Sequence, residues 1–186
     1  MNKGIEAETH SGYRDIKDVP SEYVPFYLLA KRVREVLQHT ADGHSIEETG
    51  KLMGVSRGTI DAYRHIIAGI AIKGAIGGTF DNDYPNQTQI TILALIQDGI
   101  TYGYLTHKLP EEPIQPLTPS ETKILDLTSQ GKIKAEIAKE LYFSPHIIDA
   151  QMVSIHKKLH TRNIYQAVAR ATYLRIHNMW PSTTES

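Results

Sequence analysis

The sequence predicts an all-α protein built from two tandem four-helix units that are joined by a proline-containing linker. Three observations predict this fold class. Apolar residues recur at helical spacing in successive segments along the chain. Serine or threonine stands where several of these segments should begin, as is typical of helix N-termini. Finally, the second half of the chain repeats the residue pattern of the first half.

The first unit is expected over residues 26–100, after a polar and mobile N-terminal arm at residues 1–25 that lacks a helical period. Within the unit, Ser45 and Glu48 form the pattern of a capping box, which predicts the start of a short helix. Gly54 should end that helix, since glycine readily adopts the left-handed backbone of a helix end. The expected helices span 26–41, 46–53, 57–72 and 87–97.

Residues 101–116 contain three prolines after an aromatic stretch, and they are expected to form a linker with one short strand. The second unit is expected over residues 117–180, followed by a disordered tail at 181–186. Thr118 and Glu121 repeat the capping-box pattern, and Ser144 followed by Pro145 predicts the start of a long third helix. A fourth helix over about 164–178 should close the unit.

The repeat is visible when the two halves are superposed at an offset of 88 residues. Beyond the third helix the offset falls to 77, so the first copy holds 11 extra residues in a glycine-rich turn. This pattern indicates a tandem duplication. Identical pairs include Leu37/Leu125, Gly43/Gly131, Glu48/Glu136, Ser56/Ser144, Ile60/Ile148, Asp61/Asp149, Ala62/Ala150 and Ile67/Ile155.

Composition excludes several classes of protein. The chain of 186 residues has no cysteine, so disulfide frameworks, zinc–thiolate sites and thiol nucleophiles are excluded. It has no signal-peptide pattern and no run of about 18 apolar residues, so a cytoplasmic location without a membrane segment is expected. The overall charge is −1, but residues 117–180 hold nine basic against five acidic side chains, which favours a polyanion contact there.

Catalytic and cofactor motifs are not found in the sequence. His156 and His160 have a spacing that can hold a metal ion, but no third ligand accompanies them. The glycine-rich segment near residue 76 lacks the following Lys-Ser or Lys-Thr of a phosphate-binding loop, and no Gly-x-Ser-x-Gly pattern is present. We therefore expect no enzymatic activity, no cofactor and no bound metal.

The second unit resembles the LuxR/GerE-type helix-turn-helix domain over nearly its full length. The resemblance depends on Leu117-Thr118-Pro119 with Glu121, and on Glu136-Ile137-Ala138 and Ser144-Pro145. The first unit resembles a degenerate member of the same family. The further matching positions are Gly131, Leu141, Lys157-Lys158-Leu159, Arg162-Asn163 and Ala167-Val168 in the second unit, and Leu37, Gly43, Val55-Ser56 and Thr59-Ile60 in the first.

The resemblance implies that the third helix of each unit enters the major groove of double-stranded DNA and that the fourth helix mediates dimerisation. Two of the implied base-facing residues are aspartates, which repel phosphate and accept hydrogen bonds only from cytosine or adenine amino groups. Either aspartate could instead only favour the positive end of its own helix. The base-facing candidates are Asp149, Ala150 and Val153 in the second unit and Asp61, Ala62 and His65 in the first.

Basic and polar residues around these helices are candidates for phosphate contacts, although such residues can also form a merely solvated face. The candidates are Lys132, Lys134, His146, Lys157, Lys158 and Arg162 in the second unit and Lys51, Arg57, Thr59, Arg64 and Lys73 in the first. Both fourth helices are more apolar than one small domain requires, which predicts an interface between the two copies or a homodimer between chains.

Two functions are compatible with these patterns, as is an intermediate in which the second unit binds DNA while the first only dimerises or binds protein. The first is a bacterial or bacteriophage transcription regulator that reads DNA with two helix-turn-helix units. The second is an interaction protein that keeps the fold without reading DNA and instead binds another regulator or RNA polymerase. The two aspartates and the absence of an overall positive charge favour the second.

Overall fold

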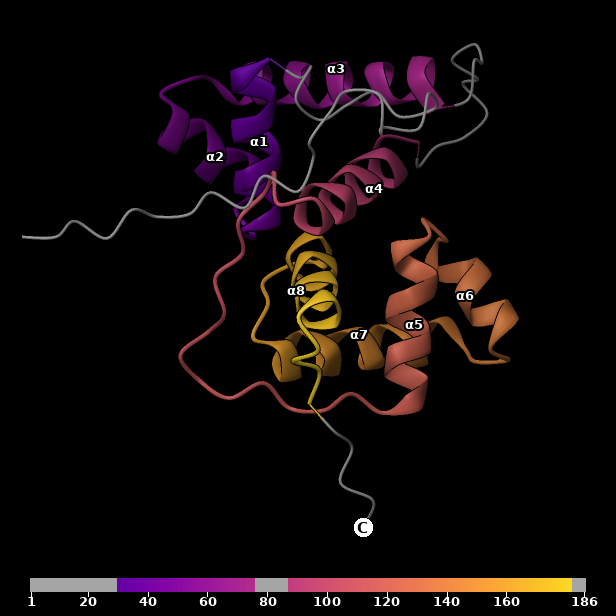
Figure 1. Cartoon of the computed structure of the whole chain (residues 1–186). Helices are drawn as coiled ribbons and strands as arrows, with labels where there is room; N and C mark the ends of the chain where they lie inside the picture. Colours follow the sequence, from indigo (N-terminus) through magenta and orange to yellow (C-terminus); the bar gives the residue numbers. More distant parts are fainter. Residues whose placement is uncertain (1–29, 76–86, 182–186) are drawn as a thin grey trace, which may run out of the picture.

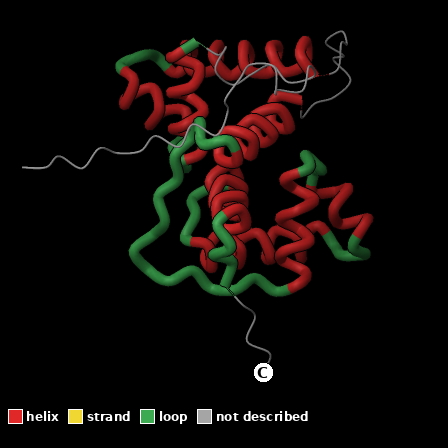
Figure 2. The backbone as a smooth tube through the Cα atoms, in the orientation of Figure 1, coloured by secondary structure: helices red, strands yellow, loops and turns green. Residues whose placement is uncertain are grey.

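The computed structural model describes residues 30–75 and 87–181. All regular secondary structure in these ranges is helical (Figure 2), which confirms the predicted all-α class. The predicted N-terminal arm, the glycine-rich turn with the 11 extra residues, and the tail beyond Pro181 lie outside the described residues. The helices are α1 (Lys31–Ala41), α2 (Ile46–Met53), α3 (Arg57–Ala75), α4 (Gln87–Thr101), α5 (Pro119–Ser129), α6 (Lys134–Glu140), α7 (Pro145–Leu159) and α8 (Ile164–Ile176).

The predicted helix starts follow from local capping. The Ser45 hydroxyl accepts from the Glu48 backbone N–H at 3.2 Å, and the Glu48 carboxylate accepts from the Ser45 N–H at 2.7 Å. Thr118 and Glu121 make the same reciprocal pair at the start of α5. Both capping boxes are therefore confirmed. Gly54 ends α2 in the left-handed conformation at φ 67°, as its type and position predicted.

The strand predicted between residues 101 and 116 is wrong. Helix α4 continues to Thr101 because Ile100 is buried in the core, and the following segment has no neighbouring strand among the described residues with which to pair. Its backbone groups form hydrogen bonds to helices instead. The Thr106 N–H and C=O are bound by the Gln38 side chain at 3.0 and 2.9 Å, and the Gln115 N–H donates to the Lys158 carbonyl at 3.0 Å.

Helices α4 and α8 pack against each other in the middle of the molecule, with α3 and α7 on opposite sides of this pair (Figure 1). Each half has its own apolar core, and each closing helix also enters the other half. Leu93 of α4 is buried in the core formed by α5 to α8, while Ala169 of α8 is buried in the core formed by α1 to α4. The interface predicted for the fourth helices therefore forms within one chain.

Two glycine turns fix how closely the halves approach. Gly43 and Gly131, which stand 88 residues apart in the sequence, both have φ +86°. A Cβ atom on Gly43 would overlap the Gln166 side chain of α8, and one on Gly131 would overlap the Ile90 side chain of α4. Each half therefore places the turn between its first two helices against the closing helix of the other half.

Side-chain amides reinforce these contacts in both directions. The Asn163 amide donates to the Gly43 carbonyl at 3.0 Å, and the Gln166 amide donates to the Asp42 carbonyl at 2.9 Å. In the opposite direction, the Gln97 amide of α4 donates to the Ser129 carbonyl at 3.0 Å. The two contacts are thus related as they would be in a symmetric dimer, although both halves belong to one chain.

Candidate nucleic-acid interface

Helix α7 presents one apolar face to the core and the opposite face to solvent. Its start is capped by Ser144, whose hydroxyl accepts from the Ile147 N–H, and Pro145 occupies the first turn. Ile148, Ile155 and Leu159 are buried, which positions the helix on α5 and α6. The three base-facing candidates of this unit all lie on the exposed face. They are Asp149, Ala150 and Val153.

Helix α3 has the same division into two faces over its first half. Ile60 and Ile67 are buried, whereas Ala62 and His65 are exposed and Asp61 is partly exposed. The base-facing candidates of both units therefore lie on solvent-accessible helix faces, where a duplex could reach them.

Each aspartate on these faces lies beside a cation from its own half. The Lys134 ammonium lies 2.9 and 3.0 Å from the two carboxylate oxygens of Asp149. The Arg57 guanidinium lies 3.8 Å from Asp61 and also bonds to Glu47 at 2.5 Å. The phosphate repulsion expected of Asp149 is therefore weakened by a charge that the sequence alone did not pair with it, whereas Asp61 shares its cation with Glu47.

Several of the candidate phosphate-binding side chains are engaged within the protein. Lys132 forms an ion pair with Glu140. Arg162 donates to Glu48 of the other half at 2.6 Å. These cations connect parts of the fold, so a phosphate would have to compete with a carboxylate for each of them.

In the first unit, the Arg64 guanidinium donates to the Tyr165 hydroxyl of α8 at 3.0 Å and lies over the Tyr165 ring. The Thr59 hydroxyl shares a hydrogen bond with Ser56 at 2.9 Å. Lys51 is exposed. The side chain of Lys73 lies outside the described residues.

Lys157 and His146 differ from the other candidates of the second unit. Both are exposed on α7, and neither has an ion pair or hydrogen bond to its side chain within the part of the chain that the structure describes. Lys157 is therefore the candidate lysine of this helix whose charge is available to an external anion.

Lys158 is instead part of a buried structural cluster around Glu121. The Glu121 carboxylate is almost fully buried and accepts from Lys158 at 2.7 Å, from the Ser154 hydroxyl at 2.6 Å and from the Thr118 N–H at 2.6 Å. Burial raises the pKa of Glu121, but these three donors outweigh it, so the pKa lies below its ordinary value of 4.5. The capping role was predicted from sequence; the links to α7 were not.

Lys158→Met should lower the free energy of unfolding by about 1–2 kcal/mol at neutral pH, because it removes one donor to a buried carboxylate that keeps two others. The pKa of Glu121 is lower in the folded protein than in the unfolded chain. The ionised carboxylate therefore stabilises the fold above about pH 4.5, and this stabilisation is lost as the pH falls through the pKa of the folded state. The difference between wild type and variant, measured by urea unfolding, should therefore shrink between pH 7 and pH 3. An undiminished difference at pH 3 would show that the ion pair is not its cause.

A second buried polar cluster surrounds Arg170 of α8, and no sequence pattern predicted it. The guanidinium donates to the carbonyls of Leu159 and His160 at the C-terminal end of α7, and to the Lys108 carbonyl at 3.3 Å. Its Nε–H donates to Nε2 of His107 at 3.0 Å. Burial, followed by the positive charge of Arg170, lowers the pKa of His107 to about 4. Arg170 thus fixes residues 107–108 of the connecting segment to α7 and α8.

The histidine pair considered from sequence as a metal site has other partners. Nδ1 of His156 shares a hydrogen bond with the Thr161 hydroxyl at 2.9 Å. His160 lies 3.2 Å from the Pro113 carbonyl through Nε2 and 3.1 Å from the Glu112 carboxylate through Nδ1. The two rings are directed to different segments of the chain.

Every helix among the described residues falls short of the length and apolar character that a membrane-spanning segment requires. No curated protein and no solved structure matches the chain. Residues 115–171 match the family of bacterial regulatory proteins described as GerE, luxR family. The matched range begins just before α5 and ends inside α8, so it contains the whole of α7 with its exposed face. The chain therefore carries a luxR-family helix-turn-helix domain at residues 115–171, which supports a DNA-binding transcription regulator at the level of the family.

Proposed function

We propose that this protein is a sequence-specific DNA-binding transcription regulator, of bacterial or bacteriophage type, that uses two helix-turn-helix units in one chain. The observation that carries the proposal is the luxR-family domain with α7 presented to solvent. The other helix-turn-helix unit of the proposal is the first unit, α1 to α4. It has the same order of helices as α5 to α8, and its closing helix packs reciprocally against the other unit.

The covalent link has a consequence for affinity. In a noncovalent dimer, two recognition helices meet DNA only after two chains associate. Here α4 and α8 already pair within one molecule, so binding of the second unit is an intramolecular step with a high effective concentration. Because α3 and α7 carry different residues, we expect an operator made of two unlike half-sites.

Within this proposal the exposed face of α7 reads bases. Val153, which is 69% exposed, offers an apolar contact of the kind that recognises the methyl group of thymine. Asp149 can accept from cytosine or adenine, and Lys134 keeps its charge compensated close to the phosphates. On α3 the equivalent positions are Asp61, Ala62 and His65.

The proposal is tested by fluorescence anisotropy of the full chain against randomised duplex and against DNA upstream of its own gene. The titrations are carried out at low and at physiological salt. Preferential binding that survives physiological salt would support sequence reading. Equal binding to every duplex, lost at physiological salt, would show phosphate attraction without readout and contradict the proposal.

Lys157→Ala should weaken DNA binding several-fold and reduce the slope of log affinity against log salt by about one, because one phosphate contact is lost. Lys123, an exposed lysine on α5, provides the matched control, and Lys123→Ala should leave both quantities unchanged. Both are measured by anisotropy titration over a salt series, with thermal unfolding to check the fold. An unchanged slope in the Lys157 variant would mean that this side of α7 does not approach the phosphates.

One observation favours the alternative function of an interaction protein that binds another regulator or RNA polymerase without reading DNA. Apolar side chains are exposed just before α7 and along it, namely Tyr142 at 95%, Ile147 at 42% and Val153 at 69%. Such groups are typical of protein interfaces when they gather on one surface. Recovery of a stoichiometric transcription protein from nuclease-treated host lysate, lost in Tyr142→Ser, would support this alternative.

The remaining parts of the proposal concern assembly and location. A homodimer through the fourth helices stays a prediction, and it would have to use faces that α4 and α8 do not turn toward each other. The proposal requires no cofactor and no catalysis, and it places the protein in the cytoplasm with its DNA.

A further inference from the structure

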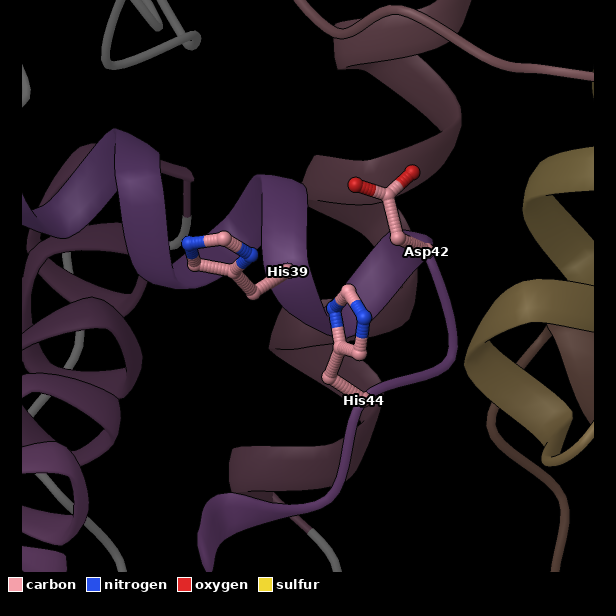
Figure 3. Close-up of side chains that lie close together, drawn as sticks. All are labelled: His39, Asp42 and His44. Carbon is pink, nitrogen blue, oxygen red and sulfur yellow. The ribbon is translucent and has the colours of Figure 1, made fainter. Parts of the chain in front are cut away.

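Two histidines and one aspartate gather where α1 ends and turns toward α2. His39 lies in the last turn of α1, Asp42 follows the helix as its C-cap, and His44 immediately precedes the capping residue of α2. Figure 3 shows the three side chains around this turn. One potential ligand atom from each residue lies within 4.8 Å of the other two. The turn therefore brings together two imidazoles and one carboxylate that are only five residues apart in sequence.

The imidazoles have unused nitrogen atoms. Nδ1 of His39 and Nδ1 of His44 are buried from solvent, and neither has a hydrogen-bond partner among the described residues. Leaving a buried polar atom unpaired is unfavourable, so such atoms call for an explanation. The two rings meet edge to face with centroids 5.4 Å apart.

We propose that His39, Asp42 and His44 bind one divalent transition-metal ion, with Zn²⁺ as the ion that best fits this set of ligands. Two imidazole nitrogens and one carboxylate oxygen form a ligand set that suits Zn²⁺ far better than Mg²⁺ or Ca²⁺, which prefer oxygen ligands only. Ligand atoms around tetrahedral zinc are about 3.4 Å apart, so the side chains need to close by roughly 1 Å or slightly more. A water molecule would complete the coordination.

The carboxylate of Asp42 is already held in position. One of its oxygens accepts from the Gln38 amide at 3.0 Å, and the same amide donates to the Thr106 carbonyl at 2.9 Å. The other carboxylate oxygen has no protein donor within the described ranges. In known sites, hydrogen bonds from neighbouring side chains orient the metal ligands in this way. Gln38 therefore acts as a positioning residue for the proposed ligand.

The proposed site lies on the turn that contacts the other half of the protein. The carbonyls of Asp42 and Gly43 accept the amides of Gln166 and Asn163 from α8. An ion bound by residues on both sides of Gly43 would restrict the turn to one conformation. We therefore expect metal binding to stabilise the contact between α8 and the first half. The site itself does not depend on DNA binding, so the two proposals fail independently.

The test is isothermal titration of the chelator-treated full chain with ZnCl₂. Wild type should bind one equivalent, and His39→Gln and His44→Gln should each lose affinity by at least tenfold. Because the chain has nine histidines, His65→Gln and His146→Gln serve as controls, and both should bind like wild type. Absence of a stoichiometric site in wild type, or wild-type affinity for Zn²⁺ in the His39→Gln and His44→Gln variants, would overturn the proposal.

A second variant guards against loss of fold. Asp42→Asn keeps the shape of the side chain and its acceptor for Gln38, and it removes only the charge. It should unfold at the wild-type temperature without metal, yet bind Zn²⁺ at least tenfold more weakly. Co²⁺ adds an independent readout, because its visible absorption should indicate nitrogen and oxygen ligands in wild type and be lost in His44→Gln. A wild-type spectrum in that variant would contradict the assignment.

The effect on the interface has its own readout. In ¹⁵N-resolved spectra, the side-chain amide signals of Asn163 and Gln166 should shift when one equivalent of ZnCl₂ is added, while that of Gln97, on the opposite contact, should stay in place. Binding of Zn²⁺ without any shift at Asn163 and Gln166 would overturn the coupling to α8.

Discussion

Replacing Arg170 by methionine should lower the free energy of unfolding by about 3–5 kcal/mol, the largest effect that we expect from a single side chain in this protein. Arg170 is 3% exposed and donates to three backbone carbonyls and one imidazole. Methionine fills a similar volume but leaves these buried acceptors without donors. Urea unfolding followed by circular dichroism measures the change.

Arg175→Met is the matched control for this substitution. Arg175 is also in α8, but it is exposed, where it pairs with Asp126 and lies over the ring of Trp180. Its loss should cost less than about 1 kcal/mol. Equal effects of the two substitutions would mean that the carbonyls around Arg170 find other donors, and that the cluster does not hold the connecting segment.

The same cluster predicts an acid sensitivity. His107 has a pKa of about 4 in the fold against its ordinary 6.5, so below pH 6.5 the unfolded chain binds a proton that the folded chain does not. Stability should therefore fall as the pH drops from about 6.5 to about 4, and this contribution should then level off. His107→Gln should flatten the decline in that window, as urea unfolding across the pH range would show.

Gly131→Ala should lower the free energy of unfolding by about 3 kcal/mol, the second large effect. The residue has φ +86°, which costs a side chain about 1–2 kcal/mol, and its new Cβ would overlap Ile90 of α4. Gly54→Ala provides the control. Gly54 has φ +67°, but a Cβ there would meet no other atom within 4 Å, so only the backbone cost of about 1 kcal/mol applies.

A double-mutant cycle separates the two causes. Trimming Ile90 to alanine should remove the overlap, so the cost of Gly131→Ala should be smaller in that background than in wild type. Thermal and urea unfolding of the four proteins measure the coupling energy. Additive effects would show that α4 does not press on the turn at Gly131, which would argue against the reciprocal packing of the two halves.

The helices of this protein could be predicted from sequence because their signals are local. Ser45 with Glu48 and Thr118 with Glu121 satisfy their own helix N-termini within three residues, and Gly54 ends α2 by its backbone freedom. The error at residues 101–116 has the opposite origin. Whether that segment forms a strand depends on a distant strand with which it could pair. Its backbone N–H groups instead donate hydrogen bonds to Gln38 and Lys158.

Local sequence patterns are thus enough to establish the all-α class, the positions of the capped helices and the resemblance of the second half to a luxR-family domain, since each depends on neighbours a few residues away. The tertiary structure instead determines which charged side chains are free to bind an external partner. The fold pairs Lys158 with buried Glu121, places Arg170 beside His107, and leaves Lys157 in solvent. It also brings α4 and α8 together within one chain. These outcomes depend on contacts between residues far apart in sequence, where burial and distance set the energy, and no local pattern encodes either.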